Sequence, residues 1–209
     1  MENILGKAEY YVSKKFEDHL SRRISYHNLA HTREVVDSAR EIGEKFEIST
    51  DQMEILLLAA WFHDVGIIEQ YHDHEERSAE LCNVFLAKHN YPADKIERIA
   101  QIILSTRIPQ KPAGILEEIM CDADLSHSGK KIFNSCAHRL RMEWENMLGK
   151  KFSDYEWLKT NINFLEENKF HTKHAKILYN EGRKTNLTEL QQKLFAYKIT
   201  PPPKHKSLS

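Results

Sequence analysis

The chain carries histidine and aspartate side chains at the ends of apolar helical segments. His31 stands four residues before Val35, at the start of an apolar stripe, and the adjacent pair His63 and Asp64 ends the run "LLLAAWFHD". A carboxylate buried without a partner is costly or stays protonated, whereas a cation within reach removes that cost. These residues therefore predict a site where imidazole and carboxylate groups share one cation.

A further carboxylate comes from the segment "ILEEIMCDADLSHSG". Asp122 and Asp124 flank the inward face of this segment on opposite sides, so helical periodicity leaves both open as the fourth ligand. Two neutral imidazoles with two carboxylates suit Mn, Fe, Ni, Co or Zn, and Mg is an alternative that prefers oxygen. We expect one divalent metal ion, whose identity the residues do not select, with coordination positions left for water and substrate.

Helical segments must position these residues. Gly and Pro are few and fall between segments with apolar residues at three- and four-residue steps, and alternating strand patterns are almost absent. We predict helices over residues 3–20, 31–47, 51–64, 75–89, 92–106, 113–124, 129–147, 153–168 and 172–195. Asp51 is expected to cap the third helix, with Glu54 three residues later, and Ser153 or Asp154 the eighth.

The predicted fold is an all-α, single compact multi-helix bundle. We expect one domain over residues 1–200, with a core at about 26–125, C-terminal helices at 129–195, and a flexible tail at 201–209. No internal repeat or linker interrupts it.

Charge and cysteine content narrow the partners and the compartment. The formal net charge is -1, so we expect neither a nucleic acid polymer nor a membrane as partner, and an anionic substrate must be bound by local cations. The three cysteines form no CxxC pair, which is typical of reduced thiols, and no run of about 18 apolar residues occurs. We expect a cytoplasmic protein, and a homodimer is compatible with the sequence.

The order His31, His63-Asp64, Asp124 resembles the H…HD…D signature of the HD-domain superfamily of metal-dependent phosphohydrolases. The stretches "YHNLAHTREVV", "LAAWFHDVGI", "HEERSAELC", "DADLSHSG", "RMEWENM" and "EGRKTNL" are similar to its branch of small predicted phosphohydrolases. The resemblance covers most of the chain and implies that these four residues are the metal ligands, which favours Asp124 over Asp122.

The chain departs from two branches of that superfamily. Some nucleotide-cleaving relatives carry an acidic residue three positions after the motif aspartate, where this chain has Ile67. The two-metal branch resembles the chain at His74 but needs a further histidine after the next helix, where Thr106 and Arg107 stand. We therefore expect one metal ion, with His74 as an outer-shell or second-site group.

The expected activity is hydrolysis of a phosphoester of a small phosphorylated metabolite by metal-activated water, and analogy with the superfamily suggests a nucleotide. The candidates for binding substrate phosphate are His27, Arg33, Arg77, Arg107 and Lys111. The candidates for catalysis or for orienting the ligands are His74, Glu75, Glu76 and Asp122.

Plainer explanations exist for several of these residues, and other functions stay open. Glu75 and Glu76 are residues that favour a helix N-terminus. Each arginine could pair with a surface carboxylate, and Arg141 and Glu143 are interpreted as an ion pair on an amphipathic helix. The alternatives to a phosphohydrolase are a di-iron HD-type oxygenase and a non-catalytic helical module that binds a metal or ligand.

Overall fold

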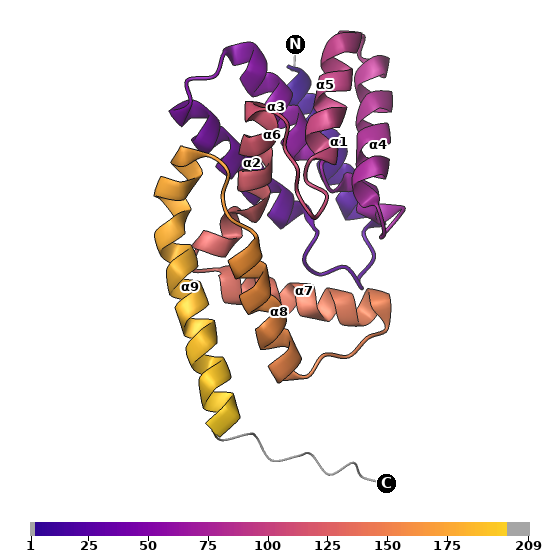
Figure 1. Ribbon diagram of the computed structural model, residues 1–209. Coiled ribbons are helices and arrows are strands. Elements are labelled where there is room, and N and C mark those ends of the chain that lie inside the picture. The colour runs from indigo at the N-terminus through magenta and orange to yellow at the C-terminus, as the bar shows by residue number, and fades with distance from the viewer. Residues whose placement is uncertain (1–2, 200–209) are drawn as a thin grey trace.

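The computed structural model describes residues 3–199, and these residues form helices and loops without strands (Figure 1). This confirms the predicted all-α class. The helices are α1 (Ile4–His19), α2 (Leu29–Lys45), α3 (Thr50–Phe62), α4 (His74–Lys88), α5 (Ala93–Leu104), α6 (Ile115–Asp124), α7 (Phe133–Leu148), α8 (Asp154–Glu167) and α9 (Lys173–Ile199), with short 3-10 helices η1 (Val65–Ile68) and η2 (Leu125–Gly129).

Each predicted helix is present, and the bounds differ by a few residues. Ser153 caps α8 as predicted, but Ser49, not Asp51, caps α3, because its hydroxyl accepts from the Gln52 N–H and the Gln52 side chain accepts from the Ser49 N–H. No described helix is long and apolar enough to cross a membrane. The predicted flexible tail at 201–209 lies outside the described residues.

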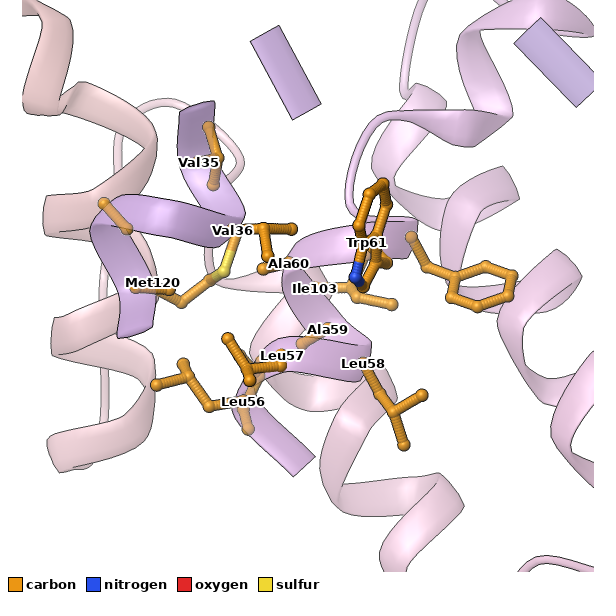
Figure 2. Packing of buried hydrophobic residues seen from close by; sticks show 14 of the residues in the cluster. Val35, Val36, Leu56, Leu57, Leu58, Ala59, Ala60, Trp61, Ile103 and Met120 are labelled. Carbon is orange, nitrogen blue, oxygen red and sulfur yellow. The ribbon is translucent and has the colours of Figure 1, made fainter. Parts of the chain in front are cut away.

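Helix α3 is the central element of the larger core. Every side chain from Ile55 to Phe62 is buried, and α3 packs against α1, α2, α4, α5 and α6. Figure 2 shows side chains leaving α3 in several directions, with Met120 of α6 on one side and Trp61 on the other. Each large side chain buried in this way contributes about 1.5–3 kcal/mol. Since His63 directly follows this helix, the apolar run carries it into the interior.

The C-terminal helices form a second, smaller apolar cluster. Phe133, Ile162, Leu165 and Leu190 bring α7, α8 and α9 together. Figure 1 shows α7 lying across the end of the α1–α6 group, where the loop between α1 and α2 descends to meet it. A cavity beside Asp124 is lined by residues of both clusters, such as Leu125 and Phe133.

Helix α9 docks closely on η2 at two glycines. A Cβ at Gly182 would overlap the Gly129 carbonyl oxygen, and a Cβ at Gly129 would overlap the carbonyl of Tyr179. Asn186, buried on the same face of α9, donates to the carbonyls of Ser128 at 2.9 Å and Lys130 at 3.1 Å. The stretches "DADLSHSG" and "EGRKTNL" are therefore two halves of one contact.

We expect Gly182→Ala to lower the free energy of unfolding by about 1–3 kcal/mol, because the added methyl group has no space against η2. Urea denaturation followed by circular dichroism measures this change. The exposed neighbour Lys184→Ala is the control and should change stability by less than about 0.5 kcal/mol. Equal stability of the Gly182→Ala variant and the unmodified chain would contradict this close packing.

Candidate metal centre

His63 is fixed at the end of α3 by its own helix. The side chain is fully buried, and its Nδ1–H donates to the Ala60 carbonyl at 2.8 Å. A carbonyl oxygen only accepts, so this hydrogen bond assigns the proton to Nδ1 and leaves the lone pair on Nε2. The imidazole is thus oriented in the way that a metal ligand requires.

Four side chains from three helical segments meet around His63 Nε2. Asp64 Oδ2 lies 3.0 Å from His63 Nε2 and 3.4 Å from His31 Nε2. Asp124 Oδ1, at the end of α6, lies 3.3 Å from His31 Nε2 and 3.8 Å from His63 Nε2. One donor atom each from His31, His63 and Asp124 falls within a mutual distance of 4.8 Å. The structure therefore brings the four predicted ligands together.

Three of these donor atoms lack a hydrogen-bond partner although they are buried. They are His31 Nε2, His63 Nε2 and Asp64 Oδ2. Buried polar atoms without partners are rare, because each loses its hydration without compensation. A divalent cation at their meeting point would satisfy all three, and a set of two imidazoles with two carboxylates suits such an ion. The residues present fit a metal site.

The histidines and aspartates of this cluster shift the pKa values of one another. Burial lowers the pKa of His31, but the nearby carboxylates of Asp124 and Asp64 outweigh this and raise it to about 10. Burial raises the pKa of Asp64, but the charge of His63 and hydrogen bonds from the neighbouring histidines hold it well below its usual range. In the metal-free protein, protons on the histidines therefore balance the negative charge of the carboxylates.

His74 holds Asp64 from the side opposite the cluster. Its Nδ1–H donates to the Tyr71 carbonyl at 3.2 Å, and its Nε2 lies 3.2 Å from Asp64 Oδ1. Burial lowers the pKa of His74, but the hydrogen bond and charge of Asp64 outweigh burial and raise it to about 9. Because His74 occupies Oδ1, Asp64 is left with Oδ2 toward the cluster. Through this contact His74 lies beside a predicted ligand, and its outer-shell role stays a prediction.

Glu143 is a site residue whose role the sequence analysis missed. Its fully buried carboxylate accepts from His27 Nδ1 at 2.5 Å and from the backbone N–H groups of Ser25, Tyr26 and His27. Burial raises the pKa of Glu143, but the hydrogen bond and charge of His27 and those N–H groups outweigh it and lower the pKa. This arrangement fixes the His27 ring 6.0 Å, centroid to centroid, from that of His31.

The expected pair of Arg141 with Glu143 does not form. Arg141 instead contacts Glu145 and Asp154, on the other side of α7. The helical spacing of Glu143 from the buried Phe133 and Cys136 puts it on the inward face, and this spacing was a usable signal.

The structure gives the predicted acidic helpers different surroundings. Asp122 accepts from the backbone N–H of His171 at 2.7 Å and of Thr172 at 2.8 Å, so it caps the approach to α9 and has no histidine to orient. Glu75 Oε2 lies 3.9 Å from His74 Nδ1, beside the site. The exposed Glu76 instead pairs with Arg107.

Most of the predicted phosphate-binding cations do not meet the cluster. Arg77 is bound by Glu69 and Glu80, and Arg107 by Asp73 and Glu76, so both are engaged as surface ion pairs. The exposed Arg33 lines a separate hollow with Arg40 and Trp61, because it stands two residues from His31 and so faces away from it. Lys111 is exposed on the loop before α6. His27 alone of this predicted group lies beside the metal centre.

A cavity of about 260 Å3 lies next to the cluster. Asp124 of the metal centre lines this cavity, as do Tyr26 and His27 beside His31, and α7 and α8 supply most of the remaining wall. The wall includes the aromatic side chains of Tyr26, His127, Phe133, Trp144, Trp157 and Phe164. Trp144 of α7 and Trp157 of α8 are therefore cavity residues.

The sequence of this region matches a known family over the same residues. The HD-domain family model matches residues 28–129, a range that contains all four clustered side chains. Residues 28–129 of the chain are an HD domain. HD domains bind divalent metal ions, and the clustered histidine and aspartate side chains of this chain form a possible site for one. Among curated proteins, none matches the chain.

Solved structures share the HD fold over nearly the whole chain. A Lactobacillus plantarum protein matches with a TM-score of 0.70 at 20% identity, over 96% of this chain and 99% of that one. Bacillus subtilis YpgQ in complex with ADP matches at 0.65 and 18%, over 95% of both chains. A predicted HD superfamily hydrolase from an uncultured Thermotogales bacterium matches at 0.62 and 19%, over 92% and 91%. At these identities the likeness shows the fold alone.

Metal binding should release about one proton or more per ion at pH 8, because a coordinated imidazole must be neutral while metal-free His31 has a pKa of about 10. Affinity should therefore rise with pH toward that value and fall as the pH is lowered. Calorimetric titration with Mn²⁺ or Zn²⁺ in two buffers of different ionisation enthalpy measures the release. An ordinary histidine, with a pKa of about 6.5, would release almost none, and that result would contradict the coupling.

Proposed function

We propose that the chain is a metal-dependent phosphohydrolase that cleaves a phosphoester of a small phosphorylated metabolite, with a nucleotide as the substrate class. One observation carries this proposal. Three buried donor atoms without partners, on His31, His63 and Asp64, lie where a divalent ion fits, beside a cavity that aromatic side chains help to line. Such a pair of neighbouring sites suits a substrate with one anionic and one planar end.

The residues of the cluster would have separate roles in holding and orienting the metal site. His31, His63, Asp64 and Asp124 would hold the ion, which supplies a Lewis acid and a water of lowered pKa when bound. His74 keeps the Asp64 carboxylate in its orientation. Phosphoryl transfer depends mainly on positioning and on stabilising charge, so rigid ligands of this kind suit it.

The cavity supports a nucleotide over a phosphorylated sugar. Aromatic rings line it, and planar bases stack on such rings. Asn161, 7% exposed, donates its amide N–H to the Trp157 carbonyl at 2.7 Å, which leaves its oxygen as an acceptor for the edge of a base. The similar fold of Bacillus subtilis YpgQ, whose structure contains ADP, supports the same substrate class.

The proposed setting of the enzyme is the cytoplasm. The free thiols of Cys82, Cys121 and Cys136 are all buried, which suits a reducing compartment. A small phosphorylated substrate is the proposed partner, without a nucleic acid polymer or a membrane.

Phosphate release from nucleotides in the presence of Mn²⁺, Co²⁺, Ni²⁺ or Mg²⁺ tests the activity. Asp64→Asn and His63→Ala should abolish both release and bound metal, because each removes a donor atom, whereas the exposed Asp37→Asn should keep both. Elemental analysis and a phosphate assay give the two readings. Full release by the Asp64→Asn variant would rule out this site, and two irons per chain without release would favour an oxygenase.

Filling the cavity should separate nucleotides from smaller substrates. Ala137 of α7 lines the cavity, so Ala137→Phe should lower kcat/KM for a nucleotide at least about tenfold, a loss of about 1.4 kcal/mol in transition-state stabilisation. Glycerol phosphate, which has no planar group, should be affected less. Ala87→Phe on the exposed side of α4 is the control. An equal loss for both substrates, or none for either, would place the organic group elsewhere.

A further inference from the structure

We propose that His127 selects a nucleotide whose base carries an exocyclic amino group, such as adenine or cytosine. This inference rests on the proposed phosphohydrolase function and adds to it the chemistry of the base that the cavity takes. His127 is not one of the predicted metal ligands, since it belongs to η2, which follows Asp124, and it lines the cavity.

His127 is almost fully buried at the wall of the cavity. The residue is 8% exposed and lines the cavity together with Phe133 and Phe164. The rings of these two phenylalanines lie nearly parallel to the imidazole, at interplanar angles of 11° and 18° and centroid distances of 6.2 and 6.1 Å. Within residues 3–199, no carboxylate oxygen lies within 4.0 Å of either imidazole nitrogen of His127. Burial therefore keeps the ring neutral, because no carboxylate in contact with it stabilises a second proton.

The contacts of Nδ1 determine which nitrogen of His127 carries the single proton of the neutral ring. Nδ1 lies 3.2 Å from the Asp124 carbonyl oxygen and 3.2 Å from the Tyr26 hydroxyl oxygen. The carbonyl only accepts, whereas the hydroxyl accepts or donates, so a proton on Nδ1 is the arrangement that satisfies both contacts. Nε2 is therefore an acceptor, and no group in the described range 3–199 donates to it.

Two further side chains offer acceptors to the same cavity. Asn161 donates to the Trp157 carbonyl, which leaves its amide oxygen for a ligand, and the Thr160 hydroxyl donates to a carbonyl of its own helix at 3.0 Å, which leaves its lone pairs. The Tyr26 hydroxyl and the indole N–H groups of Trp144 and Trp157 are donors on the wall. Every base has acceptors for such donors, so the acceptors of the wall are what distinguish one base from another.

A buried acceptor distinguishes an amino group from a carbonyl oxygen. Adenine and cytosine carry an amino group with two N–H donors, whereas hypoxanthine and uracil have an oxygen at the same position. That oxygen would face the lone pair of His127 Nε2, and both atoms would lose hydration without gaining a hydrogen bond. A site built around a buried hydrogen bond discriminates strongly against an analogue that cannot make it. The cavity therefore favours bases with an amino group.

Pairs of nucleotides that differ only at this position test the inference. With the phosphate number held equal, kcat/KM should be at least about tenfold higher for adenosine than for inosine nucleotides, and for cytidine than for uridine nucleotides. His127→Phe keeps an aromatic ring but has no acceptor, so both ratios should fall below about threefold. His138→Phe, at an exposed position of α7, is the matched control and should keep them.

Binding of nucleosides gives a second reading that needs no turnover. Trp144 and Trp157 line the cavity, so a base that stacks there should change their fluorescence. Adenosine should bind the metal-loaded chain at least about tenfold more tightly than inosine, and His127→Phe should remove most of that difference. Thr160→Val removes an acceptor with little change of shape and should lower the preference in the same direction. It is the second variant if His127→Phe lowers the unfolding midpoint.

The outcomes separate this inference from the function on which it rests. Equal use of both members of each pair, a preference for inosine, or unchanged ratios in a folded His127→Phe variant would each overturn the role of His127, while phosphate release would leave the phosphohydrolase standing. No release from any nucleotide would remove the proposed function, whereas tighter binding of adenosine would still support His127 as the residue that selects the base. Neither release nor nucleoside binding would overturn both.

Discussion

The burial of imidazole and carboxylate groups at one point is the constraint on which the site depends. His63 and Asp64 are drawn inward because α3 is apolar on all sides and lies at the centre of the larger core. Once inside, donor atoms that face each other at 3.0–3.8 Å must share protons or a cation. The pKa of His31 is raised and that of Asp64 is lowered because these groups lie so close to one another.

Two groups of helices surround this centre. Helices α1–α6 and the first part of α9 form the larger core that holds the ligands, and α7, α8 and the later part of α9 form a smaller cluster. The aromatic cavity lies where the two meet, and Glu143 reaches across that boundary to the loop before α2. The matched domain thus provides the donor atoms, whereas the added helices shape what lies next to them.

The arginines predicted to bind phosphate do not provide positive charge at the site. The arginines that the sequence offered for phosphate binding are held by nearby carboxylates, such as Glu69 and Glu80 at Arg77. Exposed pairs of this kind contribute little stability, but they do occupy the guanidinium group. The imidazole of His27, held by a buried carboxylate, is one of the polar groups that line the cavity next to the metal centre.

Local pattern in the sequence determined the helices and the side of each that faces inward, because apolar spacing reports burial directly. It also marked His31, His63 and Asp64, which stand at the ends of apolar faces. It could not choose between Asp122 and Asp124, since periodicity places both at the flanks of one face. Tertiary structure made that choice: the Asp122 carboxylate is taken by the backbone N–H groups of residues 171 and 172, whereas Asp124 meets His31. The role of Glu143 was decided in the same way, by partners more than 70 residues away. Helical periodicity extends over a few turns, so contacts between distant segments arise only when the helices pack.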